Sequence, residues 1–192
     1  MSDKVRTVIF GGTFDPVHYG HVGLAVEVCT QGLADEVWLM VSPQNPHKAG
    51  ANLTPEQQRL RMVQLATGDD CRLKACDFEF GLPRPSYTVN TLAALEDCFP
   101  EREFILLIGA DNWEKFDKWY MHDEILAKYR IIVYPRGNEA APQLPEGVTW
   151  LSAPLLNVSS TQVRTAVAAG EDISALVAPG VAEYIKENNL YR

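Results

Sequence analysis

Two histidines, His18 and His21, stand three residues apart shortly after the paired glycines Gly11 and Gly12. The chain has only four histidines, so this one segment holds half of them. At this spacing on the first turn of a helix, both imidazoles point to the same side. Imidazole N–H groups beside backbone amides at a helix N-terminus form a site for an anion. The segment therefore predicts phosphate binding.

Other interpretations of this segment stay open but are weaker. It has neither the G-x-x-x-x-G-K-[ST] pattern of a Walker A loop nor the G-x-G-x-x-G of a dinucleotide fold. A glycine pair before a helix often serves a turn alone. A metal pair is less consistent with the spacing, because metal-binding histidines on helices are usually four residues apart. Two purely structural histidines are the remaining alternative.

A second cluster near the other end of the chain carries three hydroxyls and a guanidinium, from Ser159, Ser160, Thr161 and Arg164. Hydroxyls at a helix start, followed by an arginine one turn later, again favour an anion. The alternative is an N-cap serine with a solvated arginine. From the residues alone, that alternative is the simpler interpretation.

The composition of the chain limits the way in which it can bind an anion. The chain has 192 residues and a formal net charge of -8, which argues against a broad nucleic-acid or membrane surface. No apolar run is long enough to span a bilayer, and no secretory signal precedes the first strand-like run, so we expect a cytoplasmic protein. The four cysteines have no disulfide or zinc spacing and are expected as free thiols. Any anionic ligand must be held by a local cluster.

Strand-like and helix-like segments alternate along the chain. Apolar runs predict strands at about 5–10, 35–41, 71–80, 104–108, 130–134 and 148–151. Amphipathic patterns predict helices at about 18–33, from 54 onward with Thr54 as N-cap, at 87–98, in the polar stretch holding Trp113 and Trp119, and at 160–169 and 179–188. We expect an α/β fold, a Rossmann-like doubly wound parallel sheet with helices on both faces. Residues 1–192 are expected to form one domain, with C-terminal helices (about 160–192) packed on the sheet.

The histidine segment resembles the phosphate signature G-[GS]-[TS]-F-D-P-x-H-x-G-H of the nucleotidyltransferase superfamily. The second cluster is similar to the superfamily's I-S-S-T-x-[IV]-R signature, with Val158 in place of the first isoleucine. The resemblance implies that His18, His21 and Arg164 hold the triphosphate of ATP. It also implies an ATP site made by Gly11, Gly12, Thr13, Phe14, Gly109, Asp111, Ser159, Ser160 and Thr161.

Four further segments resemble the bacterial nicotinate-mononucleotide adenylyltransferases. They are 42–48, 84–92, 109–120 and 176–191, in the expected order. The resemblance implies adenylyl transfer from ATP to nicotinate mononucleotide, giving deamido-NAD and pyrophosphate in NAD biosynthesis. It places Lys48 on phosphate and brings Mg²⁺ with ATP, without a protein metal site. It also implies a mononucleotide site of Ser86, Tyr87, Thr88, Trp119 and Tyr120, in which Trp119 stacks on the pyridine ring.

Two positions depart from that family's pattern, and two other functions stay open. Asn90 stands where aspartate is frequent, and Arg136 lies in a segment that matches only loosely. The nearer alternative is another transferase on this scaffold with a different phosphorylated acceptor. The more distant one is a non-catalytic nucleotide-binding module. A homo-oligomer is left open by the sequence.

Overall fold

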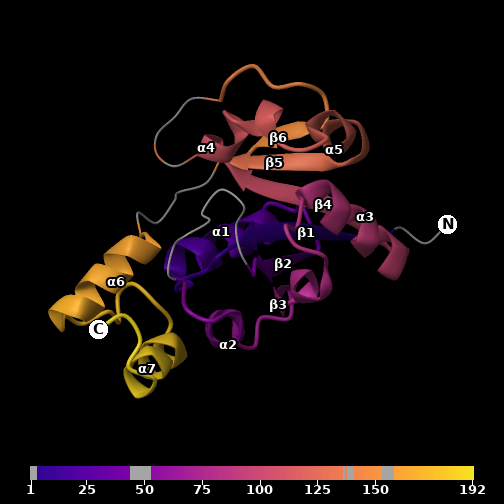
Figure 1. Cartoon of the computed structure of the whole chain (residues 1–192). Coiled ribbons are helices and arrows are strands. Elements are labelled where there is room, and N and C mark those ends of the chain that lie inside the picture. The colour runs from indigo at the N-terminus through magenta and orange to yellow at the C-terminus, as the bar shows by residue number, and fades with distance from the viewer. Residues whose placement is uncertain (1–3, 44–52, 136, 138–140, 153–157) are drawn as a thin grey trace.

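The computed structural model describes residues 4–43, 53–135, 137, 141–152 and 158–192 (Figure 1). Its centre is one sheet in the order β3-β2-β1-β4-β5-β6, with parallel pairing throughout. The strands are β1 (Val5–Gly12), β2 (Glu36–Val41), β3 (Leu73–Cys76), β4 (Arg102–Gly109), β5 (Arg130–Tyr134) and β6 (Val148–Trp150). The order reverses between β1 and β4, so the carboxyl ends of these two strands flank the crevice where ligands bind in such sheets.

Helices cover both faces of the sheet because its central strands are apolar on both sides. One core cluster joins the sheet to α1 (Tyr19–Thr30), α2 (Glu56–Thr67), α6 (Ser160–Ala169) and α7 (Pro179–Glu187). The other joins it to α3 (Thr88–Cys98), α4 (Ala110–Trp113), the 3-10 turn η3 (Phe116–Lys118) and α5 (His122–Lys128). This confirms the predicted doubly wound α/β fold.

Three expected elements differ in detail. Helix α2 has Pro55, not Thr54, at its N-cap position, so the expected cap is wrong. The amide of Thr54 instead donates to Asp15 Oδ2 at 3.3 Å, and its carbonyl accepts from Arg59. The strand expected at 71–80 stops at Cys76 and is followed by the 3-10 turn η2 (Phe78–Gly81). The polar stretch after β4 is divided into α4, η3 and α5, and helix cannot continue from η3 into α5 because Trp119 is extended and Met121 takes a left-handed conformation (φ 53°).

The two C-terminal helices are tied to the rest of the molecule by apolar packing. Val163, Val181 and Ile185 are buried in the same cluster as Val8 and Leu39 of the sheet. In Figure 1, α6 and α7 lie beside α1 and α2, on the side where the chain ends. Within the described residues, no helix is long and apolar enough to cross a membrane.

Candidate active site

A pocket of about 380 Å³ opens at the reversal of the strand order. Its floor includes Gly11 and Gly12 at the end of β1, and Ile108 and Gly109 at the end of β4. Its walls come from the start of α3 and from the segment after η3. Parallel sheets of this order bind ligands at this place, because the loops after neighbouring strands diverge there.

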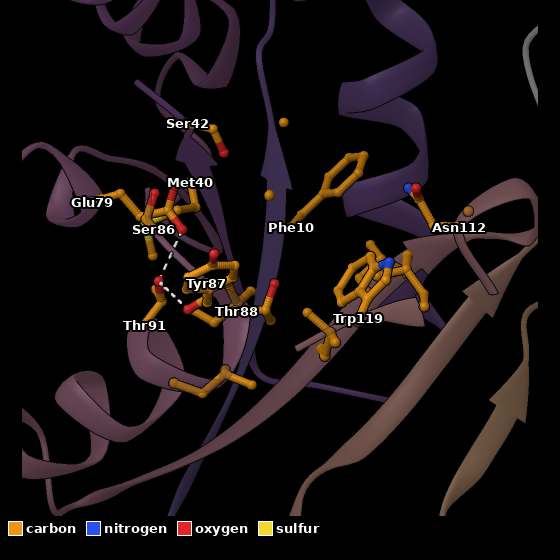
Figure 2. Close-up of a pocket in the computed structure, with 18 of the residues that line it drawn as sticks. Phe10, Met40, Ser42, Glu79, Ser86, Tyr87, Thr88, Thr91, Asn112 and Trp119 are labelled. Atoms are coloured by element: carbon orange, nitrogen blue, oxygen red, sulfur yellow. Dashed lines mark hydrogen bonds between the residues drawn. The ribbon is translucent and has the colours of Figure 1, made fainter. Parts of the chain in front are cut away.

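The five residues expected for a mononucleotide all line this pocket: Ser86, Tyr87, Thr88, Trp119 and Tyr120. Figure 2 shows Trp119 on one side and Ser86, Tyr87 and Thr88 on the other, with Phe10 between them. Trp119 is half-buried, so one part of its indole remains open to the pocket. The rings of Tyr87 and Tyr120 are 4.8 Å apart at their centroids, and both are exposed. Tyr87 belongs to the wall at the start of α3 and Tyr120 to the wall after η3, so their contact joins the two walls at the mouth of the pocket.

Glu79 also lines the pocket and was not predicted from the sequence. Its carboxylate is buried and accepts a hydrogen bond from Thr91 Oγ1 at 3.0 Å, with Ser42 and Ser86 as further side-chain partners. Burial raises the pKa of Glu79 above its ordinary value, and these hydrogen bonds only partly oppose that rise. No motif marked this residue, since its partners come from two other segments of the chain, Ser42 from one and Ser86 and Thr91 from the other.

β4 ends in Gly109, where any larger side chain would crowd two neighbouring side chains. A Cβ on Gly109 would lie 2.6 Å from Asp111 Oδ1 and 3.2 Å from the ring of Tyr134. The carboxylate of Asp111 therefore lies back over the strand end. Tyr134, at the end of β5, lines the pocket with Asn112 and Lys118, and none of these three was predicted. Only the glycine and the aspartate carried a sequence signal.

His18 and His21 lie next to each other, as their spacing predicts. His18 occupies the N-cap position of α1 and is buried, and its ring stacks on that of His21 with centroids 3.7 Å apart. The backbone N–H of His18 donates to His21 Nδ1 at 3.3 Å. A ring nitrogen that accepts carries no proton, so the neutral His21 ring holds its proton on Nε2. In this tautomer the hydrogen-bond donor of the ring is the Nε2–H group.

Phe10 connects the histidines to the pocket. Its ring lies 5.8 Å from that of His21 and 5.9 Å from that of Tyr134, measured between centroids. Phe14 packs edge-on against both Phe10 and His21. The two histidines do not line the pocket itself but stand one aromatic ring away from it. The histidine segment and the pocket are therefore neighbours.

The second predicted cluster lies against the loop that precedes the histidines, 13–16. Arg164 Nη1 donates to the carbonyl of Asp15 at 2.6 Å, and Ser160 Oγ donates to the carbonyl of Pro16 at 2.9 Å. Arg164 Nη2 also donates to Thr161 Oγ1. Ser159 caps α6 by accepting from the amide of Gln162 at 3.1 Å. The structure thus brings both signatures together, and Arg164 is half-buried rather than fully solvated.

Arg59 holds the same loop from α2, and no sequence pattern predicted it. Its side chain is almost completely buried and donates to the carbonyls of Thr13, Ser42, Pro43 and Thr54. The guanidinium has five N–H donors in a fixed fork, which suits such a set of acceptors. Lys48 and Arg136, the other basic residues considered from the sequence, lie outside the described residues.

The fold and this arrangement together define a nucleotidyltransferase with the Rossmann-like sheet. The cytidylyltransferase-like family matches residues 9–166. A probable nicotinate-nucleotide adenylyltransferase from Bacteroides thetaiotaomicron is 48% identical over 188 residues, which cover 97% of this chain and 93% of the relative. One from Flavobacterium johnsoniae is 40% identical and covers 96% and 97%. The chain belongs to the nicotinate-nucleotide adenylyltransferase family.

Solved structures agree with this assignment. A structure from Vibrio parahaemolyticus that carries the same enzyme name matches with a TM-score of 0.73 and 25% identity, covering 98% of this chain and 96% of that one. The nicotinic acid mononucleotide adenylyltransferase of Plasmodium falciparum, complexed with NaAD, matches with a TM-score of 0.77 and 20% identity, covering 97% of each chain. The second likeness concerns the fold alone.

Proposed function

We propose that this protein transfers the adenylyl group of ATP to nicotinate mononucleotide, giving deamido-NAD and pyrophosphate. The observation that carries the proposal is the pocket at the β1/β4 reversal, with Trp119 facing Thr88 one aromatic ring away from His18 and His21. A flat ring can stack on the indole while the phosphate at the other end of the mononucleotide approaches the histidines. The family assignment supports the same reaction.

The acid form of the mononucleotide suits the pocket better than the amide form. Helix α3 begins at Thr88, and the first amides of a helix have no acceptor within it. A carboxylate on the pyridine ring would accept from such amides and would be favoured by the helix dipole. A carboxamide would turn one N–H toward them and lose a hydrogen bond. The amides beside Thr88 and Tyr120 are the proposed selectivity elements.

The chemical step is an in-line displacement, in which the protein positions the two substrates and stabilises the charge that develops on the phosphates. An oxygen of the mononucleotide phosphate forms a bond to the α-phosphorus of ATP, and the bond from that phosphorus to the oxygen bridging to the β-phosphate breaks. Pyrophosphate leaves with the bonding electrons. His21 Nε2–H donates to the triphosphate, with His18, Lys48 and Arg164 adding to the set, and Ser159, Ser160 and Thr161 assisting.

The remaining residues of the proposed ATP site follow the ends of β1 and β4. Gly11 leaves the end of β1 open, because nothing lies within 4 Å of the position that its Cβ would take, whereas the buried ring of Phe14 packs against Gly12. Thr13 lies between Gly12 and Phe14 and is half-buried. Asp111, exposed beside Gly109, can accept from ribose hydroxyls. We treat residues 1–192 as one domain, because α6 and α7 share a core cluster with β1 and β2.

Mg²⁺ enters the proposal as a companion of ATP. Among the described residues, no group of three or more His, Cys, Asp or Glu side chains could hold a metal ion. Mg²⁺ commonly binds substrate phosphates and keeps several waters, so it does not need such a cage. When bound, it offsets the negative charge on the phosphate oxygens.

The deciding experiment is pyrophosphate release from Mg-ATP with three acceptors: nicotinate mononucleotide, nicotinamide mononucleotide and phosphopantetheine. A strong preference for the nicotinate acceptor supports the proposal. Equal use of both pyridine mononucleotides would refute the selectivity argument, and preference for phosphopantetheine would favour a different transferase. ATP binding without pyrophosphate from any acceptor would favour a non-catalytic module.

Two tryptophan variants then locate the acceptor. Trp119→Ala is expected to raise the KM for nicotinate mononucleotide at least tenfold, about 1.4 kcal/mol, while the KM for ATP changes little. Trp113→Ala is the matched control, because Trp113 stacks on Phe116 but does not line the pocket. Equal increases in both KM values for Trp119→Ala would exclude the stacking role.

A further inference from the structure

Tyr191 lies after α7 in sequence, yet it contacts the loop before α1. Its hydroxyl donates to Asp15 Oδ1 at 2.5 Å, across 176 positions of the chain. Asp15 is 5% exposed, and Tyr191 is half-buried against the same core cluster as α7. The chain turns back after α7, where the amide of Leu190 donates to the carbonyl of Ile185 and Tyr191 takes a left-handed conformation (φ 62°). The fold thus brings a phenol to a buried carboxylate.

Thr54 completes a triangle of contacts with these two residues. Its amide donates to the second carboxylate oxygen of Asp15 at 3.3 Å, and its side chain hydrogen-bonds to Tyr191. Burial and the hydrogen bond to Asp15 both raise the pKa of Tyr191. The phenol therefore keeps its proton at neutral pH and remains a donor to the carboxylate.

The loop held in this way would not keep its shape by itself. Phe14 has φ 47°, a left-handed conformation that costs a bulky residue about 1–3 kcal/mol. Such a conformation persists only where surrounding contacts determine it. The carbonyls of Thr13, Asp15 and Pro16 accept from Arg59, Arg164 and Ser160, respectively. Tyr191 adds a side-chain hydrogen bond to the carboxylate of the loop itself.

We propose that Tyr191 is a positioning residue for adenylyl transfer: through Asp15 it fixes the loop 13–16 so that His18 and His21 face the triphosphate. The inference rests on the proposed function. His18 follows Asp15 by three residues, and its ring stacks on that of His21, so a shift of Asp15 passes directly to both rings. Catalysis by positioned groups is sensitive to displacements of about 1 Å.

Tyr191→Phe tests this proposal because it removes one oxygen and keeps the ring in the core. We expect kcat to fall about tenfold while the KM for nicotinate mononucleotide stays near its original value. Tyr184→Phe is the matched control, since Tyr184 is a half-buried tyrosine of α7 in the same cluster. It is expected to keep the original kcat. Thermal unfolding of both variants checks that the two remain folded.

A double-mutant cycle with Asp15→Ala, which removes the acceptor of the phenol hydrogen bond, separates positioning through Asp15 from a general loss of structure. If Tyr191 acts through Asp15, Tyr191→Phe adds no further loss of kcat in the Asp15→Ala background. Additive losses, or an unchanged kcat in Tyr191→Phe alone, would overturn the proposal.

ATP binding distinguishes failure of this inference from failure of the proposed function. If the original protein releases no pyrophosphate with any acceptor, the proposed reaction is wrong. Calorimetric titration with Mg-ATP then tests the loop directly, because the loop is expected to hold phosphates whichever acceptor is used. Weaker ATP binding in Tyr191→Phe than in Tyr184→Phe would support the inference, and equal binding would refute it.

Discussion

Two glutamates are buried to nearly the same degree, Glu36 at 7% exposure and Glu79 at 8%, but they have opposite surroundings. Glu36, at the start of β2, accepts from Thr7 Oγ1 and Trp38 Nε1 and is ion-paired with Lys74 and Arg102. Glu79, in the pocket, has hydroxyl partners from Thr91, Ser42 and Ser86. Glu36 lies at the amino end of the sheet, where the strands begin, and Glu79 lies at the carboxyl end, where the pocket opens.

The charges around each carboxyl decide its titration. Burial raises the pKa of Glu36, but hydrogen bonds from Lys74 and Thr7 and the charge of Arg102 outweigh burial and leave the pKa below its ordinary value. Burial also raises the pKa of Glu79, and hydroxyl partners alone do not reverse it. The comparison teaches that a carboxylate with cationic partners stabilises the fold at the amino end of the sheet, while the carboxyl that lines the pocket has hydroxyl partners alone among the described residues.

The largest expected effect comes from removing the glutamate that has cationic partners. Glu36→Ala leaves Arg102, the Trp38 N–H and the Thr7 hydroxyl without their shared acceptor. We expect a loss of about 2–4 kcal/mol of unfolding free energy, since a partly buried pair costs somewhat less than a fully buried one. Urea denaturation measures it. A loss below that of an ordinary surface substitution would show that these contacts contribute little.

Glu79→Gln is expected to act on substrate binding more than on stability. The glutamine keeps the size of the side chain but places an N–H₂ group among the hydroxyls of Ser86 and Thr91, which flank Thr88. We expect the KM for nicotinate mononucleotide to rise about five- to tenfold, or about 1–1.4 kcal/mol, with the KM for ATP nearly constant. Initial rates with each substrate varied decide this. A uniform loss of kcat alone would contradict it.

Two threonine variants compare Glu36 with Glu79, because each variant removes one hydroxyl that donates to one of these carboxyls. Thr7→Val removes the donor to Glu36 (2.9 Å), and Thr91→Val removes the donor to Glu79 (3.0 Å). A bond to a fully ionised carboxylate is the stronger one, so Thr7→Val should destabilise by about 0.5–1 kcal/mol more than Thr91→Val. Denaturant midpoints of the two variants give the difference. Equal losses would mean that the two carboxyls are equivalent.

The smallest effect is a difference in pH dependence between Glu36→Gln and Glu79→Gln. The lowered pKa of Glu36 means that its stabilisation is present above the ordinary value of 4.5 and is lost as pH falls through the folded pKa. The raised pKa of Glu79 means that its contribution is present below 4.5 and is lost as pH rises through the folded pKa. For each variant, the difference in unfolding free energy from the original protein is measured as a function of pH across the acid range. The two difference curves should have slopes of opposite sign. Slopes of the same sign would contradict the assigned surroundings.

Much of the fold was predictable because its signals are local. Continuous apolar runs marked β1, β2, β4 and β5, and the two phosphate signatures marked the loops that the structure brings together. Trp119 and Thr88 could be assigned to one site only through resemblance, since neither pattern nor charge distinguishes them. The failed expectation at Thr54 arose because its polar groups bond to Arg59, five residues later, and to Asp15 and Tyr191, which are distant in sequence.

Glu79, Arg59 and Tyr191 escaped prediction for a shared physical reason. Glu79 and Arg59 are buried and Tyr191 is half-buried, and the polar groups of each have partners from at least two separate segments. A single sequence shows the type of such a residue but not its partners. Arg59 resembles a solvated arginine on the polar face of a helix until the fold places four carbonyls around it.

Arg59 also links three separate connections of the fold through one side chain. Its guanidinium donates to the carbonyl of Thr13 after β1, to those of Ser42 and Pro43 after β2, and to that of Thr54 before α2. A change at this one position would therefore remove the donor of four carbonyls together, so the shapes of these three connections depend on each other although they are far apart in the fold's chain order.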